Sequence, residues 1–226
     1  MAGYSTDGVA QHTFALLFYV LEKLNYYDYY VKSGEYARGS CFSHFSQSFC
    51  ELTGKTWGII GLGAIGRRVA EIASVFGCKV ICYSASGRKY ESPYEQVEFE
   101  ELLERSDFLS VHAPLNIHTE NLMTLEAFRK MKKSAIFINV ARGAIVNEQD
   151  LYTALTEGEI AGAALDVLVQ EPMDPENPLL KIQDSNRLII TPHIAWAAKE
   201  TRFRVVEEVV KNIERFMNGE TKNCVY

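Results

Sequence analysis

The stretch GIIGLGAIGRRVAEI, which begins at Gly58, constrains the fold of this chain more than any other. Three glycines, Gly61, Gly63 and Gly66, follow an apolar run at residues 56–60 and open a run with helical periodicity. In that setting the first glycine allows a tight turn, the second lets a pyrophosphate approach the backbone, and the third lets helix and strand pack closely. Free N–H groups at the start of the helix favour a bound phosphate. The stretch therefore predicts a strand–turn–helix unit that binds a dinucleotide.

Apolar runs alternate with amphipathic runs from this unit onward. We expect strands at residues 56–60, 79–83, 108–112, 135–140, 161–167 and 188–191. We expect helices at residues 65–76, 99–105, 125–131 and 148–157, and a C-terminal helix that stops near Gly219. Thr124 and Asn147 are predicted N-caps, and Gly158 is a predicted helix stop. Because nearly all-apolar strands between helices are typical of a covered parallel sheet, the predicted fold class is α/β, a Rossmann-type doubly wound parallel sheet.

The first fifty residues show a different pattern. Residues 9–24 carry apolar side chains at helical spacing, which predicts an amphipathic helix. Residues 26–50 are rich in aromatic residues and serine and are punctuated by glycine, which predicts an irregular connection. Both the apolar helix and the stretch Tyr26–Tyr30 are candidate contacts in a homodimer, although the helix could equally pack on its own domain.

Composition narrows the class of partner. The net charge of −6 argues against a nucleic-acid surface, because binding phosphates needs a basic field. No apolar run approaches the roughly 20 residues of a membrane span, and the N-terminus lacks a signal pattern. The five cysteines form no CxxC pair and no metal-ligand spacing; they are Cys41, Cys50, Cys78, Cys82 and Cys224. We therefore expect reduced thiols, no metal site, no membrane contact and a cytoplasmic location.

The end of the second predicted strand indicates which cofactor is bound. An acidic residue about 20 positions into such a unit would accept hydrogen bonds from the ribose hydroxyls. Here Ser84 occupies that position, and Ser86, Arg88 and Lys89 follow it. Hydroxyl groups and cationic side chains can bind a 2′-phosphate, which a carboxylate would repel. The sequence favours NADP over NAD, while a serine still allows NAD to bind.

Polar side chains follow the predicted strands at the edge where ligands bind in open α/β sheets. His193 follows one strand, Arg142 follows another, and Asp166 and Glu171 follow a third. An arginine can hold a carboxylate through two parallel hydrogen bonds, a histidine can give a proton to a carbonyl, and a glutamate can hold that imidazole. Beside a nicotinamide, this set predicts hydride transfer to a 2-oxo acid.

The other histidines are weaker candidates for proton transfer. His112 ends a predicted strand near the expected cofactor and could contact the site residues without touching the substrate itself. We expect the remaining three to be structural or exposed; they are His12, His44 and His118.

Six motifs in order resemble the D-isomer-specific 2-hydroxyacid dehydrogenase family: STDGVAQHTFALL, ELTGKTWGIIGLGAIG, HAPLNIHTENL, INVARGAIVN, LDVLVQEP and TPHIAW. The resemblance implies that Arg142 binds the substrate carboxylate, that His193 is the acid/base and that Glu171 is its partner. It implies that Asp166 contacts the nicotinamide carboxamide. The other cofactor contacts that it implies are Ala64, Ile65, Pro114, Thr119, Val140 and Ala141.

The same resemblance divides the chain and leaves two functions open. It implies an interdomain or dimer helix at residues 1–25, an NAD(P)-binding domain at 26–196, and a C-terminal helix at 197–226 that packs on a substrate domain. We expect most of that smaller domain to be missing, since the family's N-terminal third has no counterpart here. The chain is then either a dehydrogenase acting on small 2-oxo acids, typically a homodimer, or a truncated NADP(H)-binding or regulatory module with weak or no catalysis.

Overall fold

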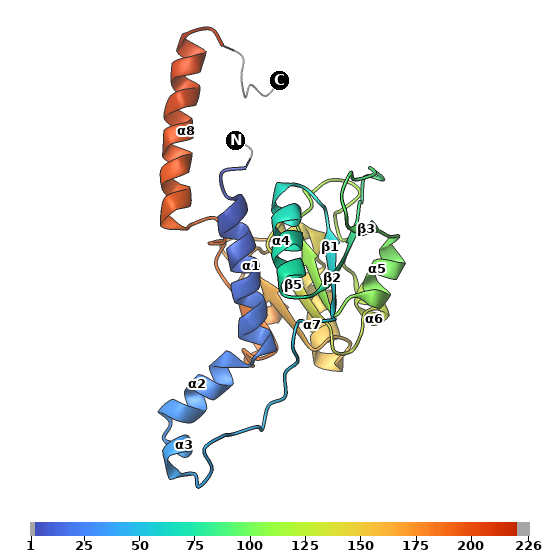
Figure 1. Cartoon of the computed structure of the whole chain (residues 1–226), viewed down its shortest axis with the longest axis vertical. Coiled ribbons are helices and arrows are strands. Elements are labelled where there is room, and N and C mark those ends of the chain that lie inside the picture. Colours follow the sequence, from blue (N-terminus) through green and yellow to red (C-terminus); the bar gives the residue numbers. More distant parts are fainter. Residues whose placement is uncertain (1–2, 221–226) are drawn as a thin grey trace.

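In the computed structural model, which describes residues 3–220, a seven-stranded parallel sheet forms the centre of the chain (Figure 1). The strand order is β3-β2-β1-β4-β5-β6-β7. The strands are β1 Thr56–Ile60, β2 Lys79–Tyr83, β3 Glu95–Gln96, β4 Phe108–Val111, β5 Ile136–Asn139, β6 Gly162–Leu165 and β7 Leu188–Ile190. The predicted fold class is confirmed. Cys224 and the end of the predicted segment 197–226 lie outside the described residues.

Helices alternate with these strands as expected. The helices are α1 Thr6–Leu21, α2 Leu24–Lys32, α3 Glu35–Arg38, α4 Ala64–Val75, α5 Phe99–Arg105, α6 Leu125–Lys130, α7 Glu148–Glu157 and α8 Lys199–Met217, with 3-10 turns η1 Gly143–Ile145 and η2 Pro178–Lys181. Three predicted helix ends are confirmed. Thr124 accepts a hydrogen bond from the Ala127 amide, Asn147 accepts one from the Asp150 amide, and Gly158 ends α7 in the left-handed region.

The sheet is covered on both faces. Alternate residues of β1 point in opposite directions, so Trp57 and Ile59 pack with α1 and α4, while Ile60 packs with α5, α6 and α7. The Trp57 indole N–H finds its acceptor inside this core, at Ser110 Oγ, 2.8 Å away. The sheet order reverses between β1 and β4, because the chain runs outward from β1 to β3 and then returns to β4. In such sheets ligands bind at the carboxyl edge of that switch point.

The predicted helix at residues 9–24 is confirmed in type but buries its apolar face within its own chain. Its buried side chains include Phe14, Leu17 and Val20, which pack against the sheet beside α4. Of the two readings of this helix, the structure therefore supports packing on its own domain.

The prediction of an irregular connection at residues 26–50 is wrong for its first part, where α2 and α3 form. Lys23 turns the chain out of α1 with a φ of 55°. Beyond it, Lys32 and Asp28 pair one helical turn apart, and the ring of His44 stacks on Tyr30 at 3.8 Å between centroids. Aromatic residues are mediocre helix formers, so the pattern of this segment concealed helices that its own ring contacts stabilise. Residues 24–49 form a protrusion that we call the aromatic arm (Figure 1).

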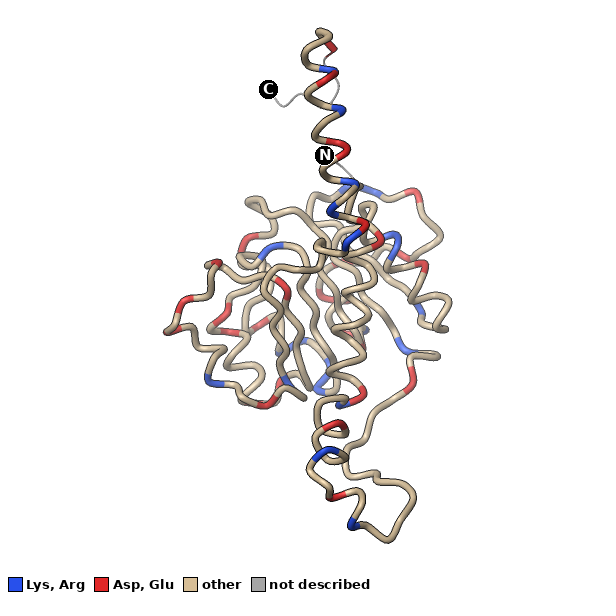
Figure 2. Tube along the Cα trace, turned by 90° about the vertical axis from the view of Figure 1, so that its left-hand side faces the viewer, with Lys and Arg blue, Asp and Glu red and all other residues tan. Residues whose placement is uncertain are grey.

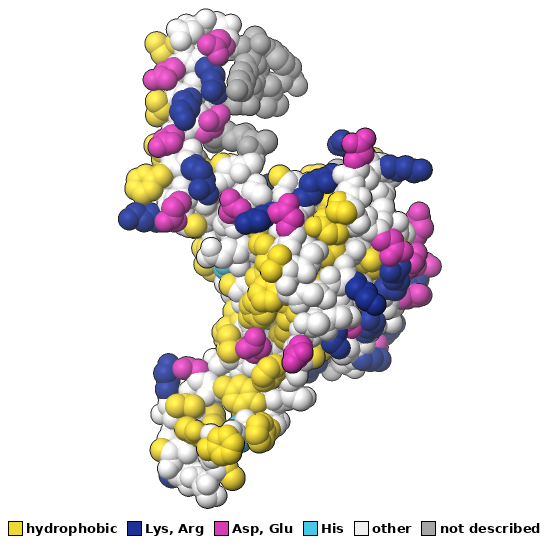
Figure 3. Space-filling model, in the orientation of Figure 1, with side chains coloured by type: hydrophobic (Ala, Val, Ile, Leu, Met, Phe, Trp, Pro, Cys, Tyr) yellow, Lys and Arg dark blue, Asp and Glu magenta, His cyan; other side chains and the backbone are white. Residues whose placement is uncertain are grey.

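Helix α8 and the aromatic arm project from opposite ends of the molecule (Figure 1). Thr201 is its one buried residue among those described. A row of exposed apolar side chains runs along the helix, visible in Figure 3: Phe203, Val206, Val209, Val210, Ile213 and Phe216. Within the described residues, nothing covers this face of α8.

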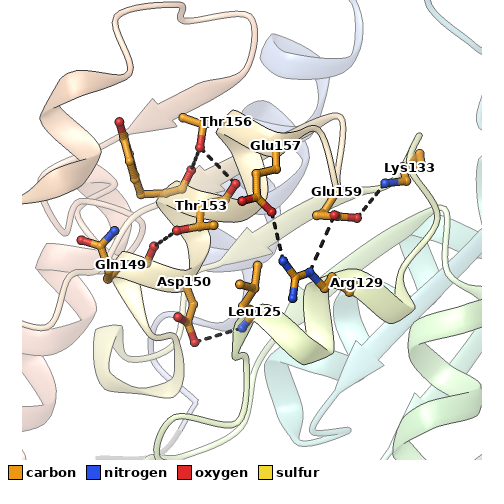
Figure 4. A network of polar contacts seen from close by, with 10 residues as sticks. Leu125, Arg129, Lys133, Gln149, Asp150, Thr153, Thr156, Glu157 and Glu159 are labelled. Carbon is orange, nitrogen blue, oxygen red and sulfur yellow. Dashed lines mark hydrogen bonds and ion pairs between the residues drawn. The ribbon is translucent and has the colours of Figure 1, made fainter.

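Charged residues of both signs are interspersed along the chain (Figure 2). Arg129 of α6 pairs with Glu157 of α7 at 3.1 Å, and just beyond the ends of these helices Lys133 pairs with Glu159 at 2.7 Å (Figure 4). Exposed pairs of this kind contribute little to stability, because water screens them. Asp150 adds a firmer link, since it accepts a hydrogen bond from the Leu125 amide at 3.0 Å (Figure 4). These contacts align the two helices that flank the strand end carrying Arg142.

Candidate active site at the carboxyl edge of the sheet

The turn between β1 and α4 is built around its glycines. A Cβ on Gly66 would lie 2.2 Å from the Gly61 carbonyl oxygen, and a Cβ on Gly61 would lie 2.8 Å from the Ala113 backbone. Gly61 also has a φ of 92°, which side chains with a Cβ rarely adopt. A Cβ on Gly63, in contrast, would meet nothing within 4 Å. Two glycines are therefore required by the fold, and the third leaves open space in front of the helix terminus.

A cavity of about 500 Å³ lies beside this turn, at the switch point between β1 and β4. Seven of the predicted cofactor residues line it: Gly61, Gly63, Ala64, Ser86, Arg88, Pro114 and Thr119. The others take different places: Gly66, Ser84 and Val140 are buried, and Ile65 and Ala141 are half-buried. The open space at Gly63, the N-terminus of α4 and the volume of the cavity all fit the diphosphate and adenosine of a dinucleotide.

The loop after β2 contributes both a hydroxyl pair and a cation. Ser84 is only 4% exposed, and its Oγ lies 3.3 Å from Ser86 Oγ. Arg88 lines the cavity with its side chain exposed, whereas the neighbouring Lys89 is exposed without lining it. The loop therefore offers one guanidinium to the cavity.

Sequence reasoning missed Arg67, which lines the same cavity. Its guanidinium donates to the Glu91 carbonyl at 3.0 Å, which ties α4 to the loop that follows β2. Two arginines, Arg67 and Arg68, directly follow the third glycine, and this pattern could have indicated a cationic side chain beside the cofactor. The helix separates the pair, because Arg68 turns away to Asp7 and Glu71, at 3.1 Å from each.

Glu171 and His193 are brought together as the resemblance implied. Glu171 Oε2 lies 2.7 Å from His193 Nδ1, and the Leu168 amide donates to Glu171 Oε1 at 2.9 Å. Burial would raise the pKa of Glu171, but the hydrogen bonds from His193 and the Leu168 amide outweigh it and leave the pKa below its usual value. The His193 side chain is 41% exposed. An anionic carboxylate thus holds one ring nitrogen of a histidine whose other side faces the site.

Both residues line a second cavity, of about 600 Å³, whose wall is otherwise largely apolar. Its lining also includes Asp166, Leu168, Met173, Leu180, Ile190 and Thr191.

Asp166 is 1% exposed and lies beneath the turn that carries His193. Its carboxylate accepts hydrogen bonds from the Thr191 hydroxyl at 2.5 Å and from the amides of Ile194 and Ala195 at 2.9 and 2.8 Å. Burial opposes its charge, but contacts with His12, Thr191 and these amides keep the pKa of Asp166 below its ordinary value. The contact of Asp166 with nicotinamide stays a prediction.

Arg142 follows β5, two strands away from β7 in the sheet. The side chain of Asn139 shapes its turn by donating to the Arg142 carbonyl at 2.9 Å and accepting from the Ala141 amide at 3.0 Å. The Arg142 guanidinium is exposed and donates to the Ala141 carbonyl. Within residues 3–220 no carboxylate lies in ion-pair reach of it. The guanidinium therefore keeps donors for a further anion.

His112 borders the cofactor cavity but is unsuited to proton transfer near neutral pH. Burial lowers its pKa to about 3. Its Nε2 lies 3.0 Å from Ser110 Oγ, while its buried Nδ1 has no hydrogen-bond partner among the described residues. His44 belongs to the aromatic arm, and His118 lies in an exposed loop.

The described residues contain neither a candidate membrane span nor a cluster of metal ligands. No helix there has the length and apolar character needed to cross a membrane. No group of three histidine, cysteine or acidic side chains in the same residues could hold a metal ion.

Comparisons with known proteins place these features in context. Residues 14–195 match the family model for the NAD binding domain of D-isomer specific 2-hydroxyacid dehydrogenases. A hydroxypyruvate reductase of Blautia hydrogenotrophica is 38% identical over 98% of this chain and 69% of its own length. A glyoxylate reductase of Korarchaeum cryptofilum is 39% identical over 96% of this chain and 65% of its own. This chain thus spans about two thirds of these relatives.

Two solved structures show the same architecture. The D-lactate dehydrogenase of Aquifex aeolicus, complexed with NAD and lactic acid, has a TM-score of 0.88 and 32% identity over 98% of this chain and 69% of that one. An acyclic imino acid reductase in complex with NADPH and D-Arg has a TM-score of 0.83 and 35% identity over 99% of this chain and 69% of that one.

Proposed function

Because this chain belongs to the D-isomer specific 2-hydroxyacid dehydrogenase family, we propose that it transfers a hydride between NAD(P)H and a small 2-oxo acid. The observation that carries the proposal is the 2.7 Å contact between Glu171 and His193 at the same sheet edge as the cavity of the glycine turn. Reduced nicotinamide supplies the hydride in this reaction.

The residues of this chain donate the proton to the substrate carbonyl and bind the substrate carboxylate. Since His193 Nδ1 is held by Glu171, Nε2 is the nitrogen left to give its proton to the carbonyl oxygen. The Glu171 carboxylate stabilises the imidazolium that serves as the acid. Arg142 binds the carboxylate of the 2-oxo acid through paired hydrogen bonds, a role that suits an arginine without an acidic partner among the described residues.

We propose that NADP is the preferred cofactor and that NAD binds more weakly. Arg88 lines the cavity past Ser84, where a carboxylate would exclude the 2′-phosphate. Both cofactors occur among similar structures, since the imino acid reductase was solved with NADPH and the lactate dehydrogenase with NAD.

A second candidate is an NADP(H)-binding module with weak or no turnover. The exposure of Arg142 and of the His193 side chain favours it, because water weakens the charged interactions on which catalysis depends.

A steady-state assay of NADPH oxidation separates the two. Glyoxylate, hydroxypyruvate and bulkier 2-oxo acids are supplied in turn, and NADPH binding is measured separately by fluorescence. We expect turnover that falls by about 10²–10⁴-fold in His193→Gln, with NADPH affinity kept. Glu171→Gln lowers turnover with the His193 ring still present. Tight NADPH binding without turnover of any 2-oxo acid contradicts the proposal that the chain is a dehydrogenase. That outcome supports the second candidate, an NADP(H)-binding module.

A further inference from the structure

His12 is a polar side chain on the helix face of α1 that packs toward the sheet. Its neighbours on that face are apolar, including Val9, Leu16 and Val20. The His12 Nε2 atom lies 3.0 Å from Thr191 Oγ1 and 3.5 Å from Asp166 Oδ1. A residue near the start of the chain thus reaches the strand end that precedes His193.

The direction of these hydrogen bonds follows from the number of hydrogens available. Thr191 Oγ1 donates its single hydrogen to Asp166 Oδ1 at 2.5 Å. The Thr191 oxygen must then accept from His12, which places a hydrogen on His12 Nε2. The order is His12 to Thr191 to Asp166, and the side chain of Asp166 is the terminal acceptor.

Asp166 in turn holds the backbone around His193. Its carboxylate accepts from the amides of Ile194 and Ala195, and its backbone carbonyl accepts from the His193 amide at 2.8 Å. His193 has a φ of 53°, a left-handed conformation that is unfavourable for a residue with a Cβ and that needs support from its surroundings. The carboxylate of Asp166 and its carbonyl provide that support from both sides of the residue.

We propose that His12 is a positioning residue: through Thr191 it orients the buried Asp166 carboxylate, and through Asp166 it holds the turn 191–195 that presents His193 to substrate. The proposal rests on the proposed function for the role of His193, but the contact chain can be tested without turnover. Removing the His12 donor lets Thr191 rotate, so Asp166 loses one fixed partner and the amides of Ile194 and Ala195 open more often.

The test compares His12→Leu, which lacks the donor, with His12→Gln, whose Nε2 can reach Thr191. Thr191→Val keeps the shape of the relay residue and removes its hydroxyl, which provides a second route if His12→Leu folds poorly. Gln11→Leu, an exposed neighbour on α1, is the matched control. The readouts are NMR hydrogen exchange at the Ile194 and Ala195 amides, and kcat and KM for the 2-oxo acid.

We expect His12→Leu to speed exchange at both amides about tenfold and to lower kcat by a similar factor, with less than about a twofold change in KM. His12→Gln restores both quantities, and Gln11→Leu changes neither. Thr191→Val also removes the hydroxyl that donates to Asp166, so its effects are at least as large as those of His12→Leu. Because the two residues act in series, the double variant is no worse than Thr191→Val alone.

Unchanged exchange at Ile194 and Ala195 in His12→Leu overturns the proposal, and so does a His12→Gln variant that behaves like His12→Leu. Absence of turnover in the unmodified protein contradicts the proposed function instead, and the exchange rates still decide the role of His12.

Discussion

Three histidines reach the carboxyl edge of the sheet, and their partners give them different chemistry. His193 is half-exposed and held by an anionic Glu171, so it can exchange a proton with a ligand. His112 is kept neutral by burial, and His12 is engaged with Thr191 and Asp166. The residue type alone does not distinguish these roles, because burial and the nearest acceptor decide the charge of an imidazole.

We expect His112 to make the stability of the fold depend on pH. Its folded pKa, about 3, lies below the 6.5 of an unperturbed histidine, so the unfolded chain takes up a proton that the folded chain does not. Stability is fully present above pH 6.5 and falls as the pH drops toward 3, by about 1 kcal/mol between pH 6.5 and 5.5. Urea unfolding at a series of pH values measures this. His112→Gln should flatten the slope over that interval, and an equal slope in the variant contradicts the assignment.

Arg88 is expected to separate the two cofactors. Its guanidinium borders the cavity past Ser84, where the 2′-phosphate of NADPH would lie. Arg88→Ala should weaken NADPH binding by about tenfold or more, the value of a charged hydrogen bond, and leave NADH binding nearly unchanged. Fluorescence titration with each cofactor measures both affinities. Lys89→Ala is the control, because Lys89 does not line the cavity. Equal losses for NADPH and NADH in Arg88→Ala refute the 2′-phosphate contact.

At the scale of elements, the unit β1–turn–α4 shows how one motif serves two purposes. Gly66 lets α4 approach the Gly61 carbonyl, and Gly63 leaves space in front of the helix N-terminus. Gly66 is required for packing, whereas Gly63 leaves room for a ligand, although both residues are glycines. The space around each missing Cβ distinguishes them.

Alanine substitutions test this division. Gly66→Ala forces a Cβ to 2.2 Å from the Gly61 oxygen, so the melting temperature should fall by several degrees, as expected for a loss of about 1–3 kcal/mol. Gly63→Ala has nothing within 4 Å, so its melting temperature should stay near the original while cofactor affinity drops about tenfold or more, because the methyl group occupies the path of the diphosphate. Calorimetry and fluorescence titration report the two effects. A Gly63→Ala protein that binds cofactor normally contradicts the assignment.

At the scale of the whole molecule, two apolar surfaces project from opposite ends of the sheet domain, as Figure 3 shows. One is the exposed row on α8, and the other is the aromatic arm, where Phe42 and Phe45 are 90% and 84% exposed. Helix α1 offers no such surface, because its apolar face covers the sheet of its own chain. Exposed apolar patches that gather several side chains are typical of contact surfaces.

We expect the chain to form a homodimer through the aromatic arm. Phe45→Glu and Tyr29→Glu each place a charge on the proposed interface, so they should shift sedimentation from twice the mass of one chain to a single chain. Phe216→Glu, on the exposed face of α8, is the matched control and should leave the dimer intact. Dissociation by Phe216→Glu with no effect of Phe45→Glu places the interface on α8 instead and contradicts the prediction.

Local patterns determined much of this protein. Apolar runs of four to seven residues between helices specified the parallel sheet, since such strands are stable only when covered on both faces. Caps at Thr124, Asn147 and Gly158 were readable because their partners lie within four residues. The residues that follow β5, β6 and β7 were placed at one edge by the same logic, because parallel strands end together.

The sequence by itself therefore determined the fold class, the glycine turn and the sheet edge after which Arg142, Glu171 and His193 lie. Only the tertiary structure decided which of two adjacent arginines faces the cavity, that the first part of residues 26–50 is helical, and that His12 reaches Thr191 across 179 positions of chain. These outcomes depend on the rotation of a helix and on contacts between distant segments. Such contacts form only when the elements pack, so no local pattern encodes them.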